Sequence, residues 1–287
     1  MPSYSNPVKS SCFFGEFMRR FNSLVLLVFA LFARTSFADI VITLNVTSGL
    51  TSSQQAVLTT AKSFWESTLT GYKPGISITG PTITASGTAI DGAGGVLGSA
   101  GPTGAVFQGG YFLTTAGQMQ FDTADLAVLE TNGQLQSVFF HEMAHVLGFG
   151  TLWTLNGAYV DGSGQFTGAN ALNQYKSEFN QPAATFVPVE LGGGESTANS
   201  HWKEVEGGTA NTGIVDGHNR DFKFELMTGW LNSPTFVSNT TIASFEDIGF
   251  TSNLSAVPEP SSIALFAISI IVLRGFWSGK RGRSSEG

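Results

Sequence analysis

One short segment constrains this chain more than any other. Phe139 to Trp153 reads FFHEMAHVLGFGTLW and holds two of the chain's four histidines. Residues four apart lie on one face of an α-helix, so a helix here presents His141 and His145 to one point. That spacing suits two ligands of a single tetrahedral metal ion. Glu142 projects to the side, where it can act on a water at the metal without being a ligand. The H-E-x-x-H pattern therefore predicts a catalytic zinc helix with Glu142 as general base.

The residues around this pair favour a metal site. Phe139, Phe140, Met143 and Val146 are apolar, so the helix is predicted to be buried. Two imidazoles and a carboxylate are costly to bury without a partner, and a zinc ion is such a partner. The alternative is an ordinary amphipathic helix on which the three residues fall by chance.

The predicted helix spans residues 133–147, with Thr131 or Asn132 as its cap. Gly148 can end it in a left-handed turn that redirects the chain. An uninterrupted metzincin pattern, H-E-x-x-H-x-x-G-x-x-H, would place a third histidine at position 151, but that residue is Thr151. Threonine cannot replace a histidine ligand, so the third ligand must come from further along the chain.

Only two histidines remain for this role. His201 lies in GGGESTANSHWKEVEG, and His218 lies in VDGHNRD. The second sequence is polar and turn-like, and a solvated histidine is the simpler interpretation there. The residues alone favour His201 only modestly, and a catalytic zinc ion typically takes three protein ligands.

Three motifs in the chain resemble the leishmanolysin family of metzincin zinc peptidases. They are HEMAHVLGF, SHW and ELMTG, in that order, followed by SFEDIGF. In that family a long insertion precedes the third histidine, and here it spans 53 positions from Gly148 to His201 (201 − 148). The resemblance covers most of residues 98–250. It implies that His201 is the third zinc ligand and that Met227 is the methionine of the Met-turn, an apolar floor beneath the metal.

The resemblance also implies an α+β, metzincin-like fold and a zinc-dependent endopeptidase. A twisted mixed sheet with the active-site helix would form an upper lobe, about residues 39–150. A smaller irregular lobe, about residues 151–256, would carry the third ligand and the Met-turn. One catalytic Zn²⁺ would activate a water whose proton Glu142 takes as the peptide bond is attacked. An extended substrate would pair with a strand edge, supplied by AVFQ (105–108) or QMQF (118–121).

The first 38 residues have the layout of a secretory signal peptide. Two arginines follow Met18, a candidate for the true start, and an apolar run leads to a small-residue site ending at Ala38. The run is short for a retained membrane anchor, which is the alternative. The chain's single cysteine, Cys12, lies here. The mature protein therefore has no disulfide, no cysteine ligand and no cysteine switch for latency.

Residues 257–287 combine a Pro-Glu-Pro motif, an apolar run and a basic end. Such a segment stops in a membrane with its basic end in the cytoplasm. The tail resembles the PEP-CTERM sorting signal of Gram-negative bacteria, which implies processing by an exosortase. We therefore expect an exported protein, secreted or at the cell surface, with only a transient C-terminal membrane anchor. The alternative is a plain, permanent anchor.

Residues 39–256 remain as the catalytic domain, and their charge narrows the possible partners. The whole chain has 14 Lys and Arg and 21 Asp and Glu. Removing the eight basic and three acidic residues of the two ends leaves 6 and 18, a net charge of −12. So acidic a balance argues against nucleic acid or an anionic membrane as partner. It suits an exported protein that acts on a protein or peptide substrate.

The remaining elements are expected from local patterns. Strands are predicted at 39–47 and 75–86, and a helix is predicted to follow Ser52 or Ser53 as its cap. The glycine-dense stretch 91–110 is predicted to form surface loops, and short strands follow it. Few elements are expected over 150–200, and a closing helix is predicted at 240–249. Asp122, Asp125 and the loops DGSGQ and DGHNRD are candidate calcium ligands. None has the spacing of a calcium loop, so capping or solvated roles are favoured. Trp202 and Trp230 line a cleft or belong to the core.

Two other functions stay open. A surface- or matrix-associated binding protein could use a zinc ion only structurally, a role that suits a PEP-CTERM tail. A structural zinc usually has four protein ligands and needs no base, whereas Glu142 adjoins this pair and no fourth ligand is evident. The other possibility is zinc-dependent hydrolysis of a non-peptide bond, which the resemblance at the Met-turn makes less favoured.

Overall fold

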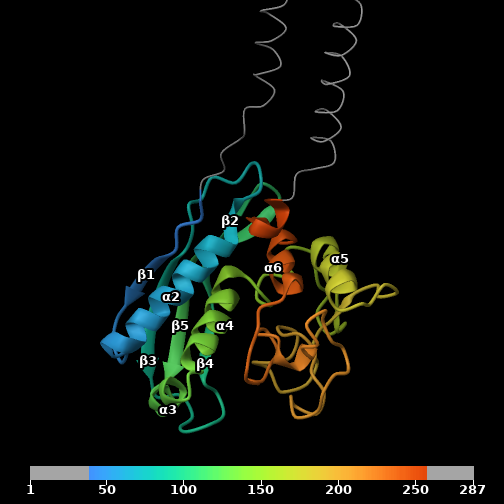
Figure 1. Ribbon diagram of the computed structural model, residues 1–287. Coiled ribbons are helices and arrows are strands. Elements are labelled where there is room, and N and C mark those ends of the chain that lie inside the picture. Colours follow the sequence, from blue (N-terminus) through green and yellow to red (C-terminus); the bar gives the residue numbers. More distant parts are fainter. Residues whose placement is uncertain (1–38, 257–287) are drawn as a thin grey trace, which may run out of the picture. The chain divides into compact units, whose positions relative to one another are not determined.

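The computed structural model describes residues 39–256 (Figure 1). The predicted signal peptide and the predicted PEP-CTERM tail with its short membrane segment lie outside this range. Among the described residues, none of the helices combines the length and the apolar character that spanning a membrane requires.

A four-stranded mixed sheet forms one part of the described domain (Figure 1). In order across the sheet, its strands are β1 (Thr43–Val46), β3 (Thr82–Thr88), β5 (Tyr111–Asp122) and β4 (Gly98–Gln108). The pairs β1–β3 and β3–β5 are parallel, whereas β4 and β5 form an antiparallel hairpin. Since β4 is last in this order, one of its edges has no neighbouring strand within the described range.

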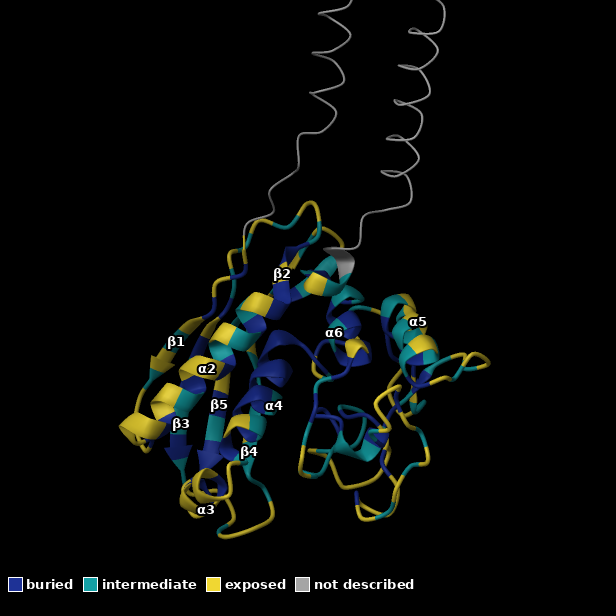
Figure 2. Ribbon diagram, viewed as in Figure 1, coloured by how far each residue is buried: buried dark blue, intermediate teal, exposed yellow. Residues whose placement is uncertain are grey.

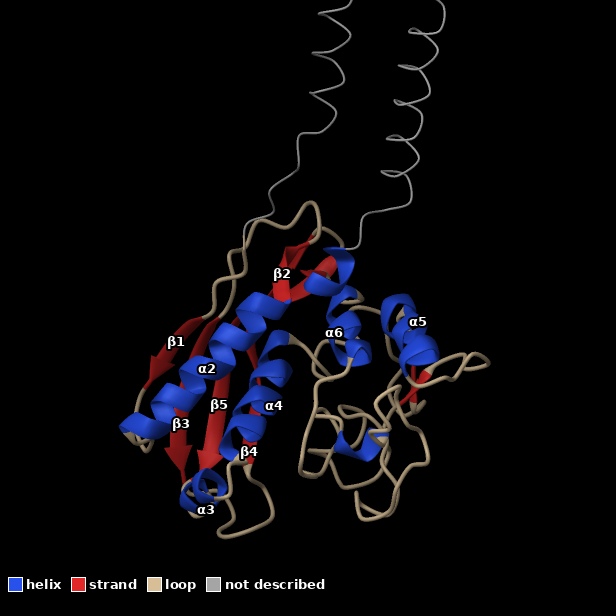
Figure 3. Ribbon diagram, in the orientation of Figure 1, coloured by secondary structure: helices blue, strands red, loops and turns tan. Residues whose placement is uncertain are grey.

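Helices α2 (Ser52–Thr68) and α4 (Leu135–Leu147) lie side by side over one face of the sheet (Figures 1 and 3). Phe121 of β5 and Phe139 of α4 are both fully buried, with ring centroids 4.2 Å apart. Trp65 of α2 is also fully buried, and its indole N–H donates to the carbonyl of Phe140 at 3.0 Å. This bond satisfies a polar group inside an apolar interface and fixes α2 against α4. Figure 2 shows α4 buried along most of its length and α2 exposed on its outer side.

The start of α2 is set by a capping box. The Thr51 hydroxyl accepts the Gln54 N–H at 3.3 Å, and the Gln54 side chain accepts the Thr51 N–H at 2.9 Å. Our prediction of Ser52 or Ser53 as the cap is therefore wrong. Thr51 takes the role because it is the last residue with an extended backbone.

The cap predicted for α4 is also wrong. Thr131 belongs to a separate short helix, α3 (Leu126–Thr131), and Asn132 follows it. The helix α4 begins after Gln134, which makes no side-chain capping bond. The turn between α3 and α4 uses Gly133 at a φ of +70°, a conformation that favours glycine.

The chain after α4 forms a second, less regular lobe (Figure 3). Its elements are β6 (Gln165–Phe166), α5 (Ala169–Glu178), β7 (Val187–Pro188), η1 (Phe222–Phe224), α6 (Asn239–Glu246), β8 (Phe250–Ser252) and η2 (Asn253–Ala256). Strand β8 returns to pair antiparallel with β2 (Leu69–Tyr72), which directly follows α2. The end of the second lobe is thus joined by backbone hydrogen bonds to the first.

The predicted α+β fold is confirmed, with its twisted mixed sheet, its helix of two histidines and an irregular second lobe. The closing helix is found as α6. The prediction of loops over 91–110 holds for residues 91–97 but is wrong beyond them, because residues 98–108 form β4. Glycines weaken the side-chain pattern of a strand, but here they admit close neighbours. A Cβ on Gly98, for example, would lie 2.9 Å from the side chain of Glu142.

Close packing of the sheet on α4 gives a first prediction. A Cβ on Gly117 of β5 would overlap Cγ1 of Val146 and lie 3.1 Å from the Gly101 carbonyl oxygen. We predict that Gly117→Ala lowers the free energy of unfolding by about 1–3 kcal/mol, as overpacking does. Urea denaturation measures it. Gly101→Ala is the matched control, since its Cβ would meet only the Thr151 methyl at 3.8 Å. A second substitution, Val146→Ala, should recover part of the loss, and wild-type stability of Gly117→Ala would contradict the packing.

Candidate metal centre and cleft

Helix α4 presents His141, Glu142 and His145 towards the second lobe. It ends at Leu147, and Gly148 caps it with a φ of +120°. A Cβ on Gly148 would lie 2.9 Å from the side chain of Ile248, so close packing adds to the backbone reason for glycine.

Thr151 occupies the position at which the uninterrupted metzincin pattern would place its third histidine, and it has another role here. The Thr151 hydroxyl donates to the carbonyl of His145 at 2.7 Å, in addition to the Gly148 N–H that this carbonyl accepts at the end of α4. The third histidine comes instead from the second lobe.

His201 is held in place by backbone pairing on both sides. Its carbonyl accepts the Glu190 N–H at 2.9 Å, and the next residue, Trp202, donates its backbone N–H to the Met227 carbonyl at 3.0 Å. The Trp202 ring is fully buried and stacks on Trp153, with centroids 4.9 Å apart. Trp202 therefore belongs to the core and anchors the neighbouring histidine.

Each of the three imidazoles is oriented by a backbone carbonyl. The Nδ1 atom of His141 lies 2.7 Å from the Leu226 oxygen. For His145 the partner is Phe149, at 2.9 Å, and for His201 it is Thr197, at 2.9 Å. A carbonyl can only accept, so Nδ1 carries the hydrogen in all three rings. Each Nε2 therefore presents a bare lone pair.

The three Nε2 atoms converge on one point. Each lies 3.0 Å from the other two. Three lone pairs without hydrogens cannot hydrogen-bond to one another, but they suit a single cation. Neutral imidazole nitrogens are ligands that zinc favours, and three of them leave an open position on a tetrahedral ion. Within residues 39–256, this is the one group of three or more potential ligands that meets so closely.

Burial keeps these imidazoles neutral. It lowers the pKa of His141 to about 4 and that of His201 to about 3. The pKa of His145 lies well below its ordinary value, through burial first and through the neighbouring histidines second. The neutral ring is the form that binds a metal. His218, the other candidate, is exposed in a turn and does not approach the cluster.

Glu142 lies beside the cluster rather than in it. Its side chain is only 7% exposed, and burial raises its pKa to about 8. It packs against Gly98 at the start of β4, where a glycine leaves the space for it. A carboxylate with a raised pKa, next to a potential metal site, is suited to exchanging a proton near neutral pH.

These groups open onto a cleft with a volume of about 640 Å³. One wall comes from the first lobe, from residues 95–100 and α4. The other comes from the second lobe, from Gly193, residues 195–201, Leu226 and residues 228–231. Trp230 lines this cleft, in contrast to the buried Trp202. The sequence did not predict that residues 95–100 line the cleft, because their glycines give no pattern typical of a strand.

Met227 is fully buried in the turn between Leu226 and Thr228. The backbone of this turn contacts one histidine directly, since the Leu226 oxygen accepts from His141. The Met227 oxygen accepts the backbone N–H of Trp202, the residue after His201. Glu225, which directly precedes this turn, was not predicted from the sequence to have a role. Its position before the predicted Met-turn was the only feature of the sequence that pointed to it.

The fold and the site together define a class: an α+β protein with a three-histidine centre in an open cleft. A family model described as leishmanolysin (peptidase M8) matches residues 103–257. The match covers more than half of the chain, so the chain belongs to the leishmanolysin family. Membership of this family, together with the three-histidine cluster, indicates a zinc metallopeptidase, and a peptidase acts on protein or peptide substrates. A comparison with curated proteins found no match.

Asp122, one of the candidate calcium ligands, accepts hydrogen bonds from backbone N–H groups. One oxygen of Asp122 accepts the N–H groups of Ile90, Asp91 and Gly92 at 3.2, 2.8 and 2.9 Å, and the other accepts that of Ala124 at 2.9 Å. These bonds hold the glycine-rich loop that leads into the cleft wall.

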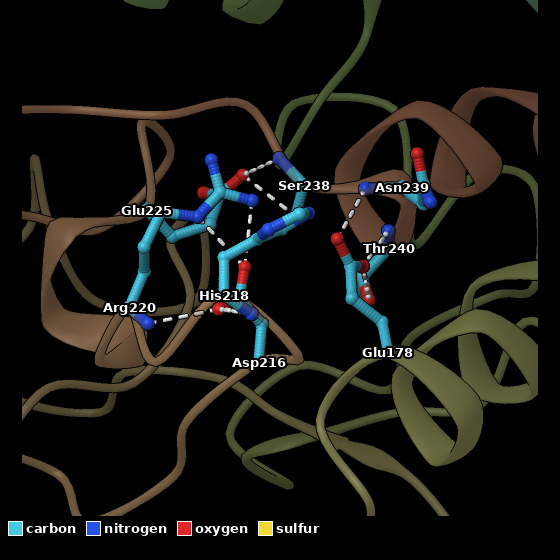
Figure 4. Close-up of polar contacts among 8 residues, drawn as sticks. All are labelled: Glu178, Asp216, His218, Arg220, Glu225, Ser238, Asn239 and Thr240. Atoms are coloured by element: carbon cyan, nitrogen blue, oxygen red, sulfur yellow. Dashed lines mark hydrogen bonds and ion pairs between the residues drawn. The ribbon is translucent and has the colours of Figure 1, made fainter.

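The loop DGHNRD is similar (Figure 4). There the Asp216 carboxylate accepts the N–H groups of His218 and Arg220 and pairs with the Arg220 guanidinium at 2.6 Å. The capping role that we favoured for these acidic residues agrees with both arrangements.

The Asp122 anchor gives a prediction about pH. The Ala124 N–H is the largest influence that lowers the pKa of Asp122, and the other three N–H groups add to it against the effect of burial. A carboxyl group whose pKa is lowered in the folded state stabilises the fold when the pH is above its ordinary, unfolded-state pKa. This stabilisation is lost as the pH falls through the lowered, folded-state pKa. Asp122→Asn should therefore lower the free energy of unfolding, and the deficit should shrink from about pH 7 to about pH 3. Urea denaturation across this range measures it. Exposed Asp39→Asn is the control, and a deficit independent of pH would contradict the charge argument.

Proposed function

We propose that the chain is an exported, zinc-dependent endopeptidase with its active site in the cleft between α4 and the second lobe. The observation that carries this proposal is the triangle of Nε2 atoms, each 3.0 Å from the others, beside the buried carboxylate of Glu142. His141, His145 and His201 would hold one ion. Met227 would lie beneath it as an apolar floor.

The residues of the chain would divide the work as follows. A zinc ion bound there would act as a Lewis acid on the peptide carbonyl and would lower the pKa of water at the site. Glu142, next to His141 on α4, would accept the proton of the attacking water and deliver it to the leaving nitrogen. The carbonyls of Leu226, Phe149 and Thr197 would keep the imidazoles in the ligating tautomer.

The substrate is proposed to lie along the edge of β4. Among the described residues this strand pairs on one side only, and Gly98, Ser99 and Ala100 line the cleft. Small side chains let a second backbone approach and pair with the strand. Of the two edges predicted from the sequence, QMQF is wrong, because β5 is paired on both sides. AVFQ lies in β4, but further along it than the residues that line the cleft.

A binding protein with a structural zinc remains the second candidate. Within the described range the cluster supplies three ligands and no fourth, and it faces an open cleft. Both features favour a catalytic site, since structural zinc sites are closed by four protein ligands. Hydrolysis of a non-peptide bond is disfavoured by membership of a peptidase family.

A further proposal concerns location. We propose export through the N-terminal signal, processing of the tail by an exosortase and a final place at the cell surface or in the medium. This rests on the sequence of residues 1–38 and 257–287. The mass and N-terminal sequence of the protein from its native host should show an N-terminus at or near Asp39 and loss of residues after the Pro-Glu-Pro motif. An intact chain would contradict the proposal.

The catalytic proposal is tested by removing and restoring the metal. Residues 39–256 should cleave an unfolded protein substrate, lose this activity when zinc is stripped by a chelator, and regain it with one zinc per chain. His201→Ala should lower both zinc content and activity, because it removes one of three ligands.

Glu142→Ala is the matched variant that separates binding from catalysis. It should keep one zinc per chain and lose turnover by at least about 100-fold, the effect of a general base. Near-normal turnover would contradict the role of Glu142. Tight zinc without any cleavage by the wild-type protein would favour the binding-protein alternative.

A further inference from the structure

Glu225 is a buried carboxylate that the proposed mechanism does not use. Its side chain is 1% exposed. One carboxylate oxygen accepts the Met227 N–H at 2.5 Å. The other accepts the Ser238 N–H at 3.0 Å, the Ser238 hydroxyl at 2.9 Å and the Thr241 hydroxyl at 2.6 Å. Glu225 thus makes one hydrogen bond to the Met-turn and three to the start of α6, and so joins the two.

Each of the two hydroxyl groups also accepts a hydrogen bond from an N–H group. The Ser238 hydroxyl oxygen accepts the Thr241 N–H at 3.0 Å, and the Thr241 hydroxyl oxygen accepts the Trp202 indole N–H at 2.8 Å. Both hydroxyl hydrogens are therefore free to point at Glu225. All four partners act as donors, which favours the ionised carboxylate. Burial raises the pKa of Glu225 to about 7, and the bonds from Thr241, Ser238 and Met227 oppose it.

The segment that Glu225 holds also orients two of the three histidines. The next carbonyl, that of Leu226, accepts the Nδ1 hydrogen of His141 at 2.7 Å. The carbonyl after it, that of Met227, accepts the backbone N–H of Trp202, next to His201. Trp202 is tied to the same network a second time through its indole N–H on Thr241. A shift of the turn would therefore move ligands that come from both lobes.

A second carboxylate at the same helix end provides a comparison (Figure 4). Glu178, the last residue of α5, accepts the N–H groups of Asn239 and Thr240 at 3.0 and 2.9 Å and the Thr240 hydroxyl at 2.9 Å. Its negative charge stabilises the N-terminus of α6, as that of any acidic residue near a helix N-terminus does. Its bonds go to α6 alone, whereas those of Glu225 also reach the Met-turn.

We infer that Glu225 is a positioning residue for the metal centre. Its carboxylate fixes the Met-turn against α6, so that the Leu226 carbonyl and Trp202 hold His141 and His201 in the ligating geometry. The inference rests on the proposed metal site. It assigns to Glu225 a function in metal affinity that goes beyond capping a helix.

The test compares Glu225→Gln with Glu178→Gln in the full chain. Glutamine keeps the shape of Glu225 but turns an NH₂ group towards one of its four donors, so the clamp loses at least one bond. Zinc affinity is measured by competition with a chelator at about pH 8, where the wild-type carboxylate is ionised. The absorption spectrum of the cobalt-loaded protein reports the ligand geometry. We expect zinc to bind Glu225→Gln about 10–100-fold more weakly, with an altered cobalt spectrum.

The control and a milder variant decide between positioning and plain stability. Glu178→Gln should lower the melting temperature while zinc affinity stays within about twofold of wild type and the cobalt spectrum is unchanged. Ser238→Ala removes one donor to Glu225, keeps the charge and leaves the bond between Trp202 and Thr241 in place, so it should weaken zinc binding several-fold in the same direction. If Glu225→Gln does not fold, Ser238→Ala decides, and wild-type zinc affinity in that variant would overturn the inference.

Three outcomes would overturn the inference. Wild-type zinc affinity and cobalt spectrum in folded Glu225→Gln would leave Glu225 as a helix cap only. So would a loss of affinity that Glu178→Gln shares in equal measure. A wild-type protein that binds neither zinc nor cobalt would remove the proposed metal site and this inference together, which distinguishes the two failures.

Discussion

Three imidazoles converge because three backbone carbonyls, from three separate segments, accept their Nδ1 hydrogens. The helical repeat accounts for two of the rings, since His141 and His145 lie four residues apart on α4. It does not decide which nitrogen of each ring faces the cleft. That choice is made by Leu226, Phe149 and Thr197. The second lobe therefore completes the orientation of ligands on the first, and the chemistry of the site depends on both lobes being folded.

The sheet contributes to the site mainly through its glycines, whose missing side chains leave space for neighbouring groups. Gly117 lets β5 approach α4, and Gly98 leaves the space that the side chain of Glu142 occupies. In the proposed function, the small residues at the start of the outer strand β4 would also make room for an extended peptide. A strand that looks weak by its composition thus adjoins the proposed base and is the proposed site of the substrate.

The part of the site that was predictable from the sequence is the part that local spacing encodes. The histidine pair, the adjacent glutamate and the glycine that ends α4 follow from one segment. The position of His201 needed the family resemblance, because no local rule links residues 53 positions apart. The carbonyl partners and the role of Glu225 were out of reach, since backbone acceptors are the same in every residue. The strand β4 was missed because its glycines mask the alternation by which strands are predicted.

The long insertion before His201 has a consequence for stability. The chain has a single cysteine, so no disulfide can close the loop between the two lobes within one molecule. An ion held by two ligands on α4 and one beyond the insertion would close it instead. Such a cross-link is reversible, and it would add about 4 kcal/mol at a free metal concentration a thousandfold above the dissociation constant. The supply of metal in its surroundings would then set how long the protein survives as well as how fast it works.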